Sequence, residues 1–131
     1  MPGTEPIWIE VAVVLAIHDE QLAEHGGHTG VRDRGLLDTA LSRARNAHAD
    51  GEQSLARLAA TLAFGISRHQ PFLDGNKRMS LVVAELFLDL NGLKLTASDA
   101  DCVTTFLALA AGDLPEPRLA EWIEANTVPT D

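Results

Sequence analysis

The sequence is poor in cysteine and in basic residues, and it has no tyrosine. With Cys102 alone, no internal disulfide can form and a zinc site built on several thiolates is excluded. The net charge of −9 argues against direct nucleic-acid binding, because affinity for a polyanion depends on clustered cations. No apolar run approaches the roughly 18 residues of a membrane span, so we expect no membrane partner. The apolar stretch near the N-terminus follows Glu5 and Glu10 rather than a basic segment, so it is not typical of a secretory signal, and we expect a cytoplasmic protein.

What the sequence does contain is helical periodicity. Its 131 residues, 46% of them hydrophobic, fit one domain covering 1–131. Apolar residues recur at spacings of three and four, and sustained alternation typical of strands is hard to find. Asp33 and Ser98 precede two of the periodic segments and are expected to be helix N-caps. We therefore predict an all-α bundle with helices over about 9–24, 33–46, 52–68, 76–90, 98–110 and 115–125.

The basic residues that are present are not spread evenly. Between Arg43 and Arg78 there are six Lys and Arg against three Asp and Glu, a balance of +3 inside an acidic chain. One interpretation is a site for a compact anion. The other is a set of solvated helix faces, since charge patterning alone decides little.

The stretch "QPFLDGNK" joins a long predicted helix to a strongly apolar one that begins at about Asn76. The free backbone N–H groups and the positive dipole end of the second helix point into this loop, which favours an anion. Gly75 permits close approach of a ligand, and Asn76, Lys77 and Arg78 add donors and charge. Asp74 beside bound phosphates suits Mg²⁺. Taken singly, the same residues could instead serve only as caps, turn residues or solvated charges.

The stretch "PFLDGNKR" resembles the signature of the Fic and death-on-curing (Fido) superfamily, which is His-Pro-Phe-x-Asp-Gly-Asn followed by Lys-Arg in the toxin branch. The segment "WIEVAVVLAIHDEQLAEHGGHTGVRDRGLLDTALSRARN" and the segment "FLDLNGLKL" extend the resemblance over nearly the whole chain. It implies a compact all-α Fido bundle of six to seven helices, with the active loop between two central helices. It also implies a type II toxin–antitoxin setting and transfer of phosphate from ATP to translation elongation factor Tu.

Carried over residue by residue, the resemblance gives each position of the loop a role. Asp74 would coordinate Mg²⁺, Gly75 and Asn76 would line the phosphate cradle, and Lys77 and Arg78 would bind phosphates of ATP. Lys77 stands where the adenylyltransferase branch usually has glycine, and Leu81 stands where that branch has a second arginine. Both differences favour phosphate transfer, and transfer of AMP is the alternative.

One position departs from the family signature. The catalytic histidine of the family lies two residues before Phe72, where this chain has Gln70, and His69 lies one step earlier. Glutamine has no titratable group, so it cannot act as a general base. One helical step turns a side chain by about 100°, so His69 could replace the missing base only if the helix end unwinds or shifts register. The remaining histidines have no recognisable metal spacing and are assigned no chemistry; they are His18, His25, His28 and His48.

Restraint of the activity is expected to come from another chain. Inhibitory helices of this superfamily carry a glutamate followed by glycine or asparagine, and no glutamate here is followed by either. The resemblance therefore implies a cognate antitoxin that supplies an inhibitory segment in trans, over the groove near Lys77 and Arg78. The alternative to an enzyme is a catalytically inactive Fido domain that acts as an antitoxin-binding or regulatory module.

Overall fold

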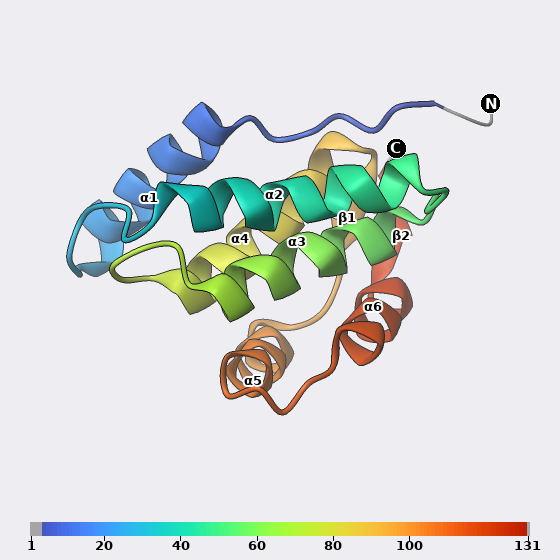
Figure 1. Ribbon diagram of the computed structural model, residues 1–131. Helices are drawn as coiled ribbons and strands as arrows, with labels where there is room; N and C mark the ends of the chain where they lie inside the picture. The colour runs from blue at the N-terminus through green and yellow to red at the C-terminus, as the bar shows by residue number, and fades with distance from the viewer. Residues whose placement is uncertain (1–3, 131) are drawn as a thin grey trace.

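The computed structural model describes residues 4–130, and most of these residues lie in helices. The all-α prediction is confirmed, with six helices in the described part of the chain (Figure 1). The helices and strands, in chain order, are α1 (Val11–His25), α2 (Arg34–Ala49), α3 (Leu55–His69), α4 (Asn76–Leu90), β1 (Leu93–Leu95), α5 (Asp99–Ala110), α6 (Glu116–Ala125) and β2 (Thr127–Pro129).

Helix α3 forms the centre of the bundle. Ten of its fifteen residues are buried, so it is covered on most sides, by α2, α4 and α6 (Figure 1). A Cβ atom at Gly65 would lie 3.2 Å from the backbone of Ala40, so the close approach of α3 to α2 depends on that glycine. The hydrophobic core therefore extends through the bundle along α3 and reaches the loop that follows it.

The starts of three helices are fixed by side-chain caps. Asp33 accepts a hydrogen bond from the backbone N–H of Leu36 at 3.1 Å, and Ser98 accepts one from that of Asp101 at 3.1 Å, so both predicted N-caps are confirmed. Ser54 caps α3 in the same way, which places the start of this helix about three residues later than predicted.

The strands β1 and β2 were not predicted. They pair antiparallel, with Leu93 opposite Pro129 and Leu95 opposite Thr127. Three residues are too few to show a sustained alternation, and the partner strand lies more than thirty residues away. The pair ties the segment after α4 to the last residues described.

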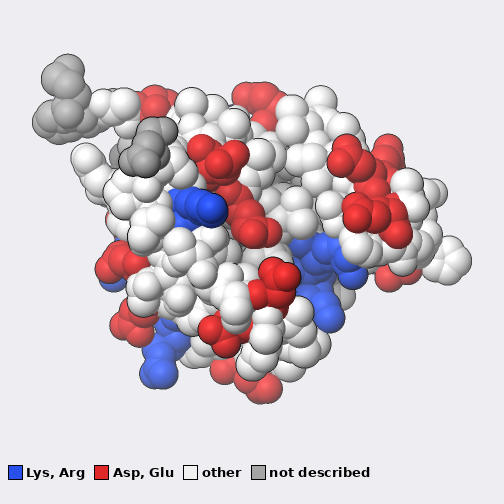
Figure 2. Space-filling model, turned by 180° about the vertical axis from the view of Figure 1, so that it is seen from behind, with Lys and Arg blue, Asp and Glu red and all other residues white. Residues whose placement is uncertain are grey.

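The two loops at one end of the bundle lie side by side. The α1–α2 loop meets the α3–α4 loop through an antiparallel bridge between Val31 and Phe72 (Figure 1). No described helix is long and apolar enough to cross a bilayer. Figure 2 shows one face of the molecule, where carboxylates are widespread and basic side chains gather in a few patches.

Candidate functional site

The loop begins with an unusual backbone conformation at Gln70. Helix α3 is regular to His69, and Gln70 then takes the left-handed conformation with φ 47° and ψ 60°. In residues 4–130 it is the one non-glycine residue with positive φ. The following Pro71 disfavours the α region at this position, which ends the helix. There is no unwinding or register shift that would move His69 into the place of Gln70.

Arg32, from the α1–α2 loop, holds this helix end. Its Nε donates to the carbonyl of Gln70 at 2.9 Å, and its Nη2 donates to the carbonyl of His69 at 2.7 Å. The backbone N–H groups of Arg32 and Asp33 both donate to the carbonyl of Pro71, at 2.7 and 3.1 Å. A guanidinium at the carbonyl end of a helix satisfies acceptors and complements the dipole. The strained turn is therefore fixed from outside the loop.

Phe72 and Asn76 fix the loop from inside. Phe72 is 1% exposed, so its side chain anchors the loop in the core. The Asn76 side chain accepts a hydrogen bond from the Phe72 N–H and donates one to the Phe72 carbonyl, both at 3.0 Å. The amide of Asn76 thus closes the turn, and its backbone N–H belongs to the first turn of α4.

His18 was assigned no chemistry from the sequence. In the structure it lies on α1 and contacts the α3–α4 loop. It is 2% exposed, and its ring stacks on Phe72 with centroids 4.0 Å apart. Its Nε2 lies 2.8 Å from the carbonyl of Asp74, and because a carbonyl only accepts, this nitrogen must carry the proton. His18 shares a face of α1 with Val14 and Leu22, both buried. The four-residue spacing of His18 from Val14 and Leu22 could have predicted that His18 is buried.

We expect His18→Leu to lower the free energy of unfolding by about 1–3 kcal/mol, because it leaves the Asp74 carbonyl without its donor. Urea unfolding measures this. The matched control is His28→Leu, since the His28 side chain is exposed and its contact with Asp74 uses the backbone. The control should change stability by less than about 0.5 kcal/mol. Equal losses in both variants would contradict the assigned role.

The carboxylate of Asp74 lies against the α1–α2 loop. The backbone N–H of His28 donates to Asp74 Oδ2 at 3.2 Å. A Cβ atom at Gly27, where φ is 122°, would lie 3.2 Å from the same oxygen and 3.0 Å from Leu22 Cδ2. Glycine is therefore needed at position 27 for this contact. The carboxylate is oriented by backbone from a loop more than forty residues away.

A cavity of about 460 Å³, which is within the usual size range of small-ligand pockets, lies at this loop. Gly75, with φ 81°, is the N-cap of α4 and provides no side-chain cap. Lys77 and Arg78 are exposed, and within residues 4–130 neither lies within 4.0 Å of a carboxylate oxygen. The cavity is lined by Ser67, Gln70, Leu73, Asp74, Gly75, Asn76, Lys77, Arg78 and Ala110.

The structure thus brings Gln70 together with the sequence-predicted segment from Asp74 to Arg78, and it leaves His69 outside the cavity lining. Helix N–H groups without a side-chain cap, a positive dipole end and two cations without carboxylate partners are features that favour the binding of an anion such as a phosphate. The Asp74 carboxylate at its edge fits a Mg²⁺ ion whose other ligands are phosphate oxygens and water. Among residues 4–130 there is no group of three or more His, Cys, Asp or Glu side chains placed to hold a metal.

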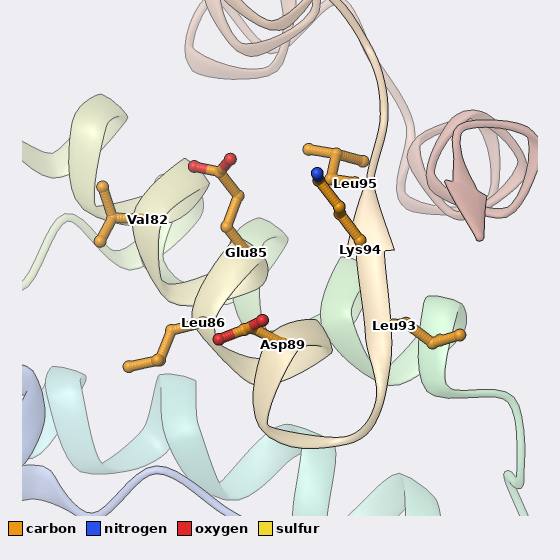
Figure 3. Close-up of a pocket in the computed structure, with 7 residues that line it drawn as sticks. All are labelled: Val82, Glu85, Leu86, Asp89, Leu93, Lys94 and Leu95. Atoms are coloured by element: carbon orange, nitrogen blue, oxygen red, sulfur yellow. The ribbon is translucent and has the colours of Figure 1, made fainter. Parts of the chain in front are cut away.

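A second groove, of about 390 Å³, lies toward the other end of α4 (Figure 3). Glu85 and Asp89 come from α4 and Lys94 comes from β1, and apolar side chains line the rest. Burial, and next the nearby Asp99, raise the pKa of Glu85 above its usual value. None of the loop residues lies in this groove, so we do not assign it to the same site.

The raised pKa of Glu85 predicts a pH-dependent stability effect. Ionisation of Glu85 is less favourable in the folded chain than in the unfolded one, so stability falls as the pH rises through the folded pKa. Glu85→Gln should therefore stabilise the protein at pH 7. The gain should be less than about 1 kcal/mol, because neighbouring atoms shield the carboxyl only in part and the side chain stays open to solvent, and there should be no effect below the ordinary pKa of glutamate. Thermal unfolding at pH 4 and pH 7 measures this. The same shift at both pH values would mean that packing, not charge, is responsible.

The chain is similar to known proteins of one family. The family model described as "Fic/DOC family" matches residues 8–88, and the chain belongs to that family. Among its relatives, "Toxin Doc" of Mycolicibacterium smegmatis is 41% identical over 75 residues, which spans 55% of this chain and only 57% of the relative. "Protein kinase doc" of Escherichia phage P1 is 32% identical over 109 residues, which spans 82% of this chain and 86% of the relative. The resemblance to the death-on-curing branch is confirmed.

Proposed function

We propose that this chain is a toxin of the death-on-curing type that transfers the γ-phosphate of ATP to a hydroxyl of a cytoplasmic protein. The observation that carries the proposal is the pair of exposed cations, Lys77 and Arg78, beside the uncapped start of α4 in a 460 Å³ cavity. The name of the phage relative supports kinase chemistry. By resemblance, the target is translation elongation factor Tu.

The residues from Asp74 to Arg78 then each have a role in the transfer. The first-turn N–H groups of α4, which begin at Asn76, and the cations Lys77 and Arg78 would bind the phosphates and stabilise the charge on the transferred group. Gly75 has no side chain, so the phosphates can approach its backbone closely. Asp74 would hold Mg²⁺, which supplies further charge neutralisation when bound.

Gln70 occupies the position from which a base would act on the target hydroxyl. Its amide can hydrogen-bond to that hydroxyl and orient it, but it cannot take the proton. Loss of a general base typically costs 10²–10⁴-fold in rate, so we propose slow transfer by the native chain. The second candidate function is an inactive module that binds an antitoxin. The absence of a base favours it, since Gln70 cannot take a proton and His69 lies outside the cavity lining.

Labelled ATP tests the proposal. Purified elongation factor Tu is incubated with the protein, Mg²⁺ and ATP labelled at either the α- or the γ-phosphate. Label from the γ-position alone supports phosphate transfer, and label from the α-position means transfer of AMP. Absence of both labels in the native chain and in Gln70→His, when ATP binds, would contradict any transferase assignment and favour the inactive module.

The proposed partner is an antitoxin whose inhibitory segment covers the cavity at Lys77 and Arg78. We expect growth arrest when Gln70→His is expressed alone, and relief when the neighbouring gene of the native operon is expressed with it. Copurification from the native operon tests the complex directly. Recovery of this protein without a partner would contradict the proposal.

A further inference from the structure

The α1–α2 loop contacts the α3–α4 loop over most of its length. The backbone N–H of His28 donates to the carboxylate of Asp74, and the carbonyl of Gly30 accepts a hydrogen bond from the backbone N–H of Leu73 at 3.1 Å. These contacts use only the backbone of the α1–α2 loop. Within residues 4–130, Arg32 is the one residue of that loop whose side chain donates hydrogen bonds to the α3–α4 loop. A substitution at position 32 can therefore remove part of the contact and leave the backbone bonds in place.

The guanidinium of Arg32 donates to two successive carbonyls, those of His69 and Gln70, at 2.7 and 2.9 Å. The direction of a carbonyl follows the ψ angle of its residue, so a planar, rigid donor that reaches both carbonyls holds two successive ψ angles. Within residues 4–130 no carboxylate oxygen lies within 4.0 Å of the Arg32 side chain, so no ion pair competes for it. The side chain of Arg32 thus fixes the backbone where α3 ends.

The left-handed turn at Gln70 determines which side chain faces the cavity. A residue with a Cβ atom rarely adopts a φ of 47°, and a residue before proline favours an extended backbone instead. An extended backbone at this position would turn the Gln70 side chain in another direction. In the observed turn, Gln70 lines the cavity and His69 does not. The contacts that hold the turn therefore also select the side chain that lies at the candidate phosphate site.

We propose that Arg32 is a positioning residue for the transfer. By holding the left-handed turn, it places the side chain of residue 70, and not that of His69, against the phosphate site. The inference rests on the proposed function. Arg32 does not line the cavity, so it acts through position 70, and it contacts none of the residues that would hold the phosphates. Its loss should therefore slow the transfer and leave nucleotide binding unchanged.

Kinetics in the Gln70→His chain test this, because that substitution puts a titratable group at position 70. We expect Arg32→Met in this background to lower kcat for γ-phosphate transfer by at least about tenfold, since small displacements of a catalytic group are costly. The affinity for Mg²⁺–ATP, measured by calorimetric titration, should not change. Arg32→Lys keeps a donor and should recover part of the rate. The matched control is Arg34→Met, because Arg34 is exposed on α2, where it pairs with Asp38 at 3.6 Å, and its loss should change neither property.

A second readout separates positioning from general stabilisation. The imidazole resonances of the Gln70→His chain should shift when Mg²⁺–ATP is added, and this response should be lost with Arg32→Met at a temperature where both chains are folded. A full response without Arg32 would overturn the inference, whether or not phosphate is transferred. An unchanged kcat, or an equal loss of kcat and of ATP affinity, would also overturn it and leave the proposed function standing. Failure of every chain to bind Mg²⁺–ATP would overturn the proposed function and the inference together.

Discussion

Replacing Gln70 with histidine is expected to raise phosphoryl transfer by about 10²–10⁴-fold, the usual contribution of a general base. Gln70 lines the cavity, and Arg32 holds its backbone carbonyl at 2.9 Å, so the new imidazole would begin from a fixed backbone. Histidine is also among the residues that adopt the left-handed conformation more readily. Initial rates of γ-phosphate transfer to elongation factor Tu measure the change.

Two further variants separate the adjacent positions. His69→Ala in the Gln70→His background should keep most of the gain, because His69 does not line the cavity. Gln70→Ala should transfer phosphate no faster than the native chain. If Gln70→His binds ATP and gains nothing, the assignment of position 70 as the base is wrong. If the native rate depends on His69 instead, the loop must rearrange during the reaction.

Replacing Phe72 with alanine is expected to lower the free energy of unfolding by about 3–5 kcal/mol. The side chain is 1% exposed and stacks on His18, so its removal leaves a cavity between α1 and the loop. Urea or thermal unfolding measures the loss. The neighbouring residue provides the control, since Leu73 is 55% exposed and Leu73→Ala should change stability by less than about 0.5 kcal/mol.

The same variant tests whether the core positions the site. At a temperature where Phe72→Ala remains folded, its affinity for Mg²⁺–ATP should fall as well, because the loop has lost its anchor. Phe72→Leu, which restores much of the buried volume, should recover part of both properties. Full nucleotide affinity in a strongly destabilised Phe72→Ala would show that the loop holds its shape without the core.

Local signals account for what the sequence predicted of the fold. Asp33 and Ser98 could be predicted as N-caps because each is a short polar residue directly before a segment with helical apolar spacing. The cap and the helix that it starts are separated by only a few residues in the sequence. The pairing of Leu93–Leu95 with Thr127–Pro129 depends on two segments distant in the chain, each too short to have a period. A local sequence pattern cannot predict such a long-range contact.

The same distinction applies to the candidate site. The segment from Asp74 to Arg78 is contiguous, so its chemistry could be predicted from one stretch of sequence. His18 reaches Asp74 from 56 residues away, and Arg32 reaches Gln70 from 38 residues away; no local pattern gave their partners. The sequence also could not decide whether His69 or Gln70 lies in the site. The left-handed turn at Gln70 places that residue in the cavity lining, and a periodicity argument cannot predict where a helix ends to within one residue.

Titration of the native protein with Mg²⁺–ATP tests the central claim, that the start of α4 is a phosphate site, most directly. We predict saturable binding that weakens with added salt, and a loss of at least about tenfold in affinity for Lys77→Met with Arg78→Met, since hydrogen bonds to charged groups are removed. Arg68→Met, which removes an exposed cation of α3 outside the cavity, should bind ATP normally. No binding by the native chain, or equal binding by the double variant, would contradict the claim.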